Sequence, residues 1–85
     1  MNVKEETPVK NNHLIEWGEA TWNSKDKSIR NRYNTDAGKF NYAGSSEIPW
    51  TDFKMMISES IKRGQLTNSE LSDIMRDISD KLKNL

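Results

Sequence analysis

The sequence contains no cysteine, so it can form neither a disulfide bond nor a thiolate zinc site. No apolar run approaches the roughly 20 residues that a membrane-spanning helix requires, and the first residues lack the apolar stretch of a secretory signal. The formal net charge is +0 at pH 7, whereas nucleic-acid-binding domains are usually distinctly basic. These absences favour a cytoplasmic protein that has no membrane partner.

Residues that could support catalysis are few. His13 is the only histidine, and Ser45 and Ser46 lack the glycines that flank a nucleophilic serine in a G-x-S-x-G turn. Lys39 follows Gly38, but the upstream glycine and the following Ser or Thr of a phosphate-binding P-loop are missing. We therefore expect no enzymatic activity, no cofactor, no bound metal and no small-molecule substrate.

The C-terminal half, residues 47–85, has the pattern of two amphipathic helices. Gly64 follows two cations and can end the first helix in a left-handed conformation. Thr67 and Glu70 have the spacing of a capping box at the start of the second helix. The short connection predicts that the two helices pack as an antiparallel hairpin. Apolar residues recur at helical intervals in both segments, namely Trp50, Phe53, Ile57 and Ile61, then Leu71, Ile74, Met75, Ile78, Leu82 and Leu85.

The N-terminal half carries weaker signals. Residues 1–12 are polar and aperiodic, which predicts a disordered tail. Residues 13–85 are expected to form a single small domain, in which 13–46 is an irregular or β-hairpin segment. Within it, residues 28–33 and 39–42 alternate around a turn in which Gly38 can adopt positive φ. The predicted fold class is α+β and helix-dominated, with a short β-hairpin or irregular segment packed on the helical hairpin.

An excess of positive charge lies between residues 25 and 42, where five cations accompany two carboxylates. Strand alternation would place Arg30 and Arg32 on one face, where they could contact phosphates while Tyr33, Phe40 or Tyr42 stacks on bases. The alternative is that these cations are solvated, or are neutralised by a carboxylate of the same chain. The carboxylates available for this are Glu16, Glu19 and Glu47. The candidate binding surface consists of Lys25, Lys27, Arg30, Arg32, Lys39 and Tyr42.

A second candidate surface lies on the predicted helices. Glu70, Asp73, Asp77 and Asp80 are spaced three, four and three residues apart, so they line one helix face and could meet a basic partner. They do not converge as the ligands of a calcium loop do, and the alternative is a solvated face. Met55 falls on the polar side of the first helix, where an adaptable methionine can contact a partner.

These features predict a small non-enzymatic protein–protein interaction module, of the kind that serves as a regulatory or accessory protein in a bacterium or phage. The chain has few apolar residues, mixed charges and no catalytic constellation. Self-association belongs to this hypothesis, because two amphipathic helices alone leave apolar edges uncovered. The alternative is a nucleic-acid-binding protein that uses the basic aromatic segment 25–42.

Overall fold

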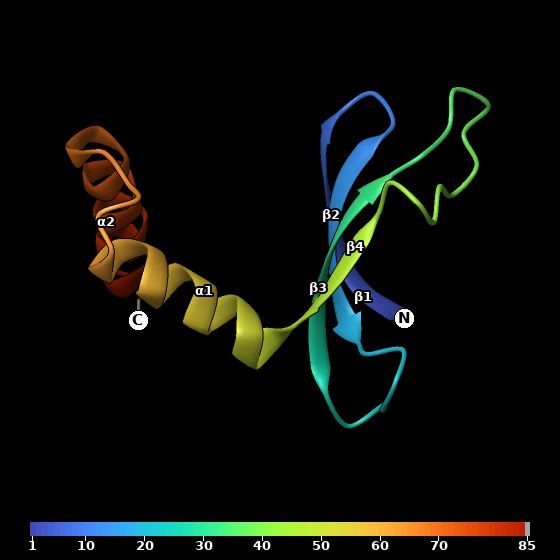
Figure 1. Cartoon of the computed structure of the whole chain (residues 1–85), viewed down its shortest axis with the longest axis horizontal. Helices are drawn as coiled ribbons and strands as arrows, with labels where there is room; N and C mark the ends of the chain where they lie inside the picture. Colours follow the sequence, from blue (N-terminus) through green and yellow to red (C-terminus); the bar gives the residue numbers. More distant parts are fainter. Residues whose placement is uncertain (85) are drawn as a thin grey trace. The chain divides into compact units, whose positions relative to one another are not determined.

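The computed structural model describes residues 1–84 and divides them into two compact units, one of residues 1–54 and one that begins at Met55. The first unit contains the strands β1 (Asn2–Lys10), β2 (His13–Glu19), β3 (Lys27–Tyr33) and β4 (Ser46–Pro49) (Figure 1). The helix α1 (Trp50–Lys62) begins at the end of the first unit, and α2 (Asn68–Leu82) belongs to the second.

The four strands form one antiparallel sheet in the order β1-β2-β3-β4 (Figure 1). Each strand pairs with the next one in the chain, so the first unit is a β-meander. Gly18 on β2 allows β1 to approach closely, because a Cβ atom at this position would lie 2.1 Å from the backbone oxygen of Asn2. A side chain there would displace β1.

The prediction of a helix-dominated fold is wrong, because the four-stranded sheet organises the first unit. The expected tail of residues 1–12 instead contains β1, which pairs along β2 from Asn2 to Lys10. Its side chains are mostly exposed and several are charged, as is common at the edge of a sheet. A strand of this kind lacks the apolar alternation by which sequence reveals a strand.

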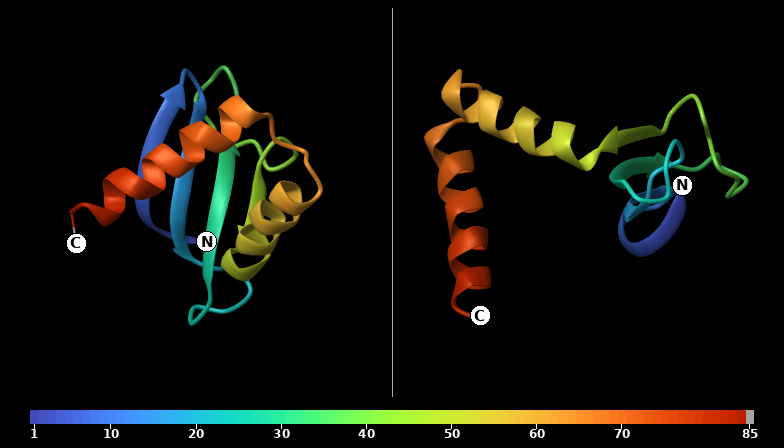
Figure 2. Two further views of the ribbon diagram at one scale, coloured as in Figure 1. Left: turned by 90° about the vertical axis from the view of Figure 1, so that its left-hand side faces the viewer. Right: turned by 90° about the horizontal axis from the view of Figure 1, so that it is seen from below.

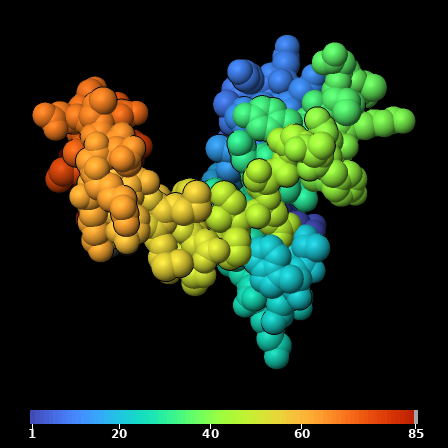
Figure 3. Space-filling view, viewed as in Figure 1, coloured from blue at the N-terminus to red at the C-terminus, as the bar shows by residue number. Residues whose placement is uncertain are grey.

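The predicted hairpin of residues 28–42 is correct in its turn but not in its second strand. Gly38 has φ +80°, and Thr35 donates its N–H to the Lys39 carbonyl at 2.7 Å. Beyond this turn only an isolated bridge joins Asn34 to Phe40. The strand β3 pairs instead with β2 and β4, so residues 34–45 form a loop, drawn in green in the space-filling view (Figure 3).

The turn between the helices has the predicted geometry. Gly64 has φ +68°. The Glu70 N–H donates to Thr67 Oγ1 at 3.1 Å, and the Thr67 N–H donates to Glu70 Oε1 at 2.8 Å, which confirms the capping box. The antiparallel packing of the two helices is not observed. Beyond the Gly64 turn α2 diverges from α1 instead of lying along it, and neither helix contains a buried residue (Figure 2).

Apolar side chains form a row across one face of the sheet. In the register of the strands, Trp17 pairs with Ile29 and Ile29 pairs with Ile48, and all three side chains are half-buried. Ala20 is the buried hydrophobic residue among residues 1–84, at 5% exposure. Neither helix within residues 1–84 is long and apolar enough to cross a membrane.

Candidate functional site

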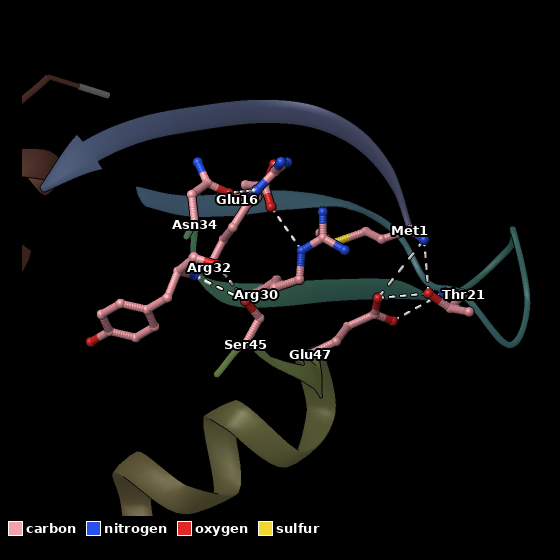
Figure 4. A network of polar contacts seen from close by, with 9 residues as sticks. Met1, Glu16, Thr21, Arg30, Arg32, Asn34, Ser45 and Glu47 are labelled. Atoms are coloured by element: carbon pink, nitrogen blue, oxygen red, sulfur yellow. Dashed lines mark hydrogen bonds and ion pairs between the residues drawn. The ribbon is translucent and has the colours of Figure 1, made fainter. Parts of the chain in front are cut away.

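The opposite face of the sheet holds a buried carboxylate. Glu16 lies on the inner strand β2 and is only 1% exposed. Arg30 donates from Nε to Glu16 Oε1 at 2.7 Å, and Arg32 donates from an Nη atom to Glu16 Oε2 at 3.2 Å (Figure 4). Burying a carboxylate is costly unless charged donors compensate it, so these two hydrogen bonds explain how Glu16 can occupy the sheet.

Phe40 lies against both guanidinium groups. The Cζ atoms of Arg30 and Arg32 are 4.6 and 4.8 Å from the centre of the Phe40 ring. Tyr42 in turn meets Phe40 edge to face, with 4.3 Å between the ring centres. Cations over an aromatic face are attracted by its quadrupole. The two arginines are thus enclosed between the Glu16 carboxylate and the Phe40 ring.

A second carboxylate lies beside Arg30 on β4. Glu47 is the cross-strand partner of Arg30, and it accepts hydrogen bonds from the Thr21 N–H at 3.0 Å and the Thr21 hydroxyl at 2.7 Å. The Met1 ammonium is 4.0 Å away (Figure 4). Partial burial acts to raise the pKa of Glu47, but the Thr21 hydrogen bonds, the ammonium and Arg30 outweigh it, so the pKa lies below its ordinary value.

The structure does not gather the predicted basic residues into one surface. Lys25 is exposed in the loop before β3, and Lys39 is exposed in the loop after it. Lys27 lies with its ammonium 4.2 Å from the centre of the Trp50 ring. Alternation along β3 puts Lys27 on the opposite sheet face from Arg30. Tyr42 is 84% exposed and contacts Phe40 edge to face.

The predicted acidic residues all lie exposed on α2 and are mostly used within the helix. Glu70 forms the capping box, and Asp73 and Asp80 form ion pairs with Arg76 and Lys83 at 3.7 and 3.9 Å. Asp77 is exposed as well. Among residues 1–84, the structure contains no group of acidic or histidine side chains that could hold a metal ion.

Exposed apolar side chains concentrate on the helices. Met55 is 58% exposed, and Met75, Ile78 and Leu82 of α2 are 70%, 55% and 59% exposed. The last three line a shallow groove along α2 together with Ser79 and Lys83. We call Met75, Ile78 and Leu82, with the half-buried Leu71 that precedes them, the α2 stripe. The sequence pattern revealed this stripe but assigned it to the core of a helical hairpin.

Sequence reasoning did not single out the partners that organise the sheet. His13 stacks on Tyr33 with 4.1 Å between the ring centres, and its Nε2 is hydrogen-bonded to Asn31 Oδ1. Phe40 was expected to stack on a base or to join the apolar core, whereas it lies against both arginines. Cross-strand pairing is the signal that would have found these groups, because Glu16 is the direct partner of Arg30 in the register of β2 and β3.

Comparison with known proteins identifies no relative. No protein-family model matches the chain, and no curated protein or solved structure matches it significantly.

Proposed function

We propose that this protein is a small non-enzymatic protein–protein interaction module whose contact surface is the apolar side of its second unit. The observation that carries the proposal is the exposure of the α2 stripe, where Met75, Ile78 and Leu82 are all more than half exposed. Contiguous exposed apolar surface of this kind is characteristic of interaction sites. A regulatory or accessory role in a bacterium or phage fits a module of this size.

The polar network of the sheet favours this proposal over binding of nucleic acid. Its two central arginines are occupied by Glu16 and Phe40, so the sheet is held by an internal polar network. A nucleic-acid site needs cations that are free to meet phosphates. The observed pairing of Arg30 and Arg32 therefore gives nucleic-acid binding less support than the apolar surface gives to protein binding.

The test is capture of a partner from a lysate of the source organism, followed by reconstitution from purified components. Three baits are compared: the unmodified chain, the surface variant Met75→Glu/Ile78→Glu, and the control Lys25→Ala/Lys39→Ala. We expect an identified protein to bind the unmodified chain and the control and not the surface variant. Equal binding by the surface variant would contradict the proposal, as would a strictly monomeric chain that captures no protein. Loss of binding in the lysine control alone, with nucleic acid recovered from the unmodified bait, would instead favour the basic segment.

A further inference from the structure

We propose that a cleft lined by Trp22 and Trp50 binds a small planar aromatic anion, that is, a ring that carries a phosphate or a carboxylate group. The cleft lies within the first unit and shares no residue with the α2 stripe. The inference therefore goes beyond the proposed protein–protein contact and does not depend on it.

The cleft has the size of a small ligand. It is formed where the loop between β2 and β3 meets the junction of β4 and α1, and its volume is about 250 Å³. Trp22, Lys25, Asp26, Lys27 and Trp50 are among the residues that line it. Pockets for drug-sized ligands have volumes of roughly 300 to 1,000 Å³, so this cleft suits one ring system with one charged group.

Both tryptophan rings are held in place by neighbours in the same unit. Trp22 is 50% exposed, and its Nε1–H donates to Asp26 Oδ2 at 3.1 Å. Asp26 is itself fixed in the loop, because its N–H donates to the Asn23 carbonyl at 3.0 Å. The Trp50 ring centre lies 5.2 Å from that of Phe53. The polar group of the Trp22 indole is thus engaged, and the exposed part of the side chain offers a pre-oriented ring face on which a ligand can stack.

Two ammonium groups at the cleft have no carboxylate partner. Lys25 and Lys27 are exposed, and neither forms an ion pair within residues 1–84. Glu19 is the cross-strand neighbour of Lys27, but its carboxylate accepts a hydrogen bond from Asn2 and pairs with Lys4 at 3.5 Å. The two ammonium groups are therefore available to an anionic group of a ligand.

The charges at the cleft favour an anion over other ligands that stack on tryptophan. A cationic ligand would be repelled by both lysines and would compete with Lys27, whose ammonium lies 4.2 Å from the centre of the Trp50 ring. A neutral sugar could stack on Trp22 but would leave both ammonium groups unpaired. An aromatic anion combines a ring that stacks on Trp22 with a charge that reaches Lys25 and Lys27.

The experiment titrates the full chain with four probes and follows the backbone and indole N–H signals by NMR. Adenosine monophosphate represents the aromatic phosphates and indole-3-carboxylate the aromatic carboxylates, while adenosine and inorganic phosphate supply the ring and the charge separately. We expect the indole signals of Trp22 and Trp50 to shift saturably with at least one aromatic anion, at a dissociation constant of roughly 0.01–1 mM. That anion should bind at least about fivefold more tightly than adenosine or inorganic phosphate.

Variants separate stacking from charge. Trp22→Ala should weaken binding at least about fivefold, whereas Trp22→Phe keeps a ring and should retain most of the affinity. Lys25→Ala/Lys27→Ala should weaken it about three- to tenfold. The matched controls are Lys39→Ala and Tyr42→Ala, an exposed cation and an exposed aromatic residue of the loop after β3, and each should change the dissociation constant less than about twofold. Circular dichroism verifies that all variants are folded alike.

Saturable binding of adenosine monophosphate alone identifies a nucleotide site, and equal binding of indole-3-carboxylate shows that the site accepts aromatic anions in general; both results support the inference. Three results would overturn it: no shift at Trp22 and Trp50 with either anion up to about 10 mM, adenosine bound as tightly as its monophosphate with no binding of the carboxylate, or equal affinities of Trp22→Ala and Tyr42→Ala. Met75→Glu/Ile78→Glu should bind the anion like the unmodified chain, so this inference and the proposed function can fail separately.

Discussion

Arg30 donates a hydrogen bond from Nε to Glu16 at 2.7 Å, and the carboxylate that it reaches is only 1% exposed. The two residues are direct cross-strand partners on β2 and β3. Arg32 satisfies the other oxygen of the same carboxylate. Arg30 and Arg32, which the sequence suggested as phosphate contacts, therefore compensate the buried charge of Glu16. The stability of the sheet depends on them.

Replacing Glu16 by glutamine should destabilise the sheet strongly. The substitution leaves Arg30 and Arg32 without their compensating charge, and removing one partner of a buried ion pair costs several kcal/mol. Because both guanidinium groups retain some contact with solvent, we expect a loss of about 2–4 kcal/mol in the free energy of unfolding. Urea denaturation followed by tryptophan fluorescence measures it.

The control for this change is Glu6→Gln. Glu6 lies directly opposite Glu16 on β1 but is exposed, so its neutralisation should change the free energy of unfolding by less than about 0.5 kcal/mol. Equal effects of the two substitutions would show that Glu16 is not an internal structural group.

Introducing a side chain at Gly18 should detach β1. The added Cβ of Gly18→Ala would lie 2.1 Å from the Asn2 backbone oxygen, so the edge strand must move. Hydrogen exchange should show lost protection of the β1 amides, with a destabilisation of about 1–3 kcal/mol.

Gly38→Ala provides a comparison of a different kind. Its Cβ meets nothing within 4 Å, but the backbone has φ +80°, so it should cost about 1 kcal/mol without loss of β1 protection. Protection of β1 that is unchanged in Gly18→Ala would contradict the close approach of these strands.

The stability of the sheet should depend on the ionisation of Glu47. Its pKa is lowered in the folded state, so its carboxylate stabilises the fold at pH values above its unfolded pKa of about 4.3. This contribution should disappear as the pH falls through the lower, folded pKa. Denaturation of the unmodified chain and Glu47→Gln between about pH 6 and 3 should give curves that converge at the acid end. A difference between them that stays constant with pH would contradict the prediction.

Loss of the helix cap should reduce the helicity of the second unit. Thr67→Ala removes the acceptor of the Glu70 N–H, which typically costs about 1 kcal/mol. Because α2 contains no buried residue, little tertiary packing compensates, and circular dichroism should report a clear loss. Ser69→Ala, an exposed change in the same first turn, is the control and should leave the helical signal close to that of the unmodified chain. A signal from Thr67→Ala that matches the control would contradict this account of the helix start.

The features that sequence predicted correctly are local ones. The capping box of Thr67 and Glu70 and the positive φ at Gly64 depend on residues that are neighbours in the chain. The alternation that puts Arg30 and Arg32 on one face is likewise a property of a single strand.

The features that sequence missed depend on distant partners. The edge strand β1 is recognisable by its pairing with β2, since its own side chains are mostly exposed. The sequence pattern identified the α2 stripe as an apolar face but could not specify what covers that face. Glu16 was only one of three carboxylates available to the arginines; strand register places Glu16 and Glu47 beside Arg30, and Glu19 beside Lys27.

The central claim is that the α2 stripe is the contact surface of this protein. Covalent footprinting of side chains in the bound and the unbound protein tests it most directly. The account predicts that binding of the captured partner protects Met75, Ile78 and Leu82 while Trp22 and Tyr42 remain equally reactive. Protection of Tyr42 or Trp22 with no change along α2 would contradict it and move the working surface to the sheet and its loops.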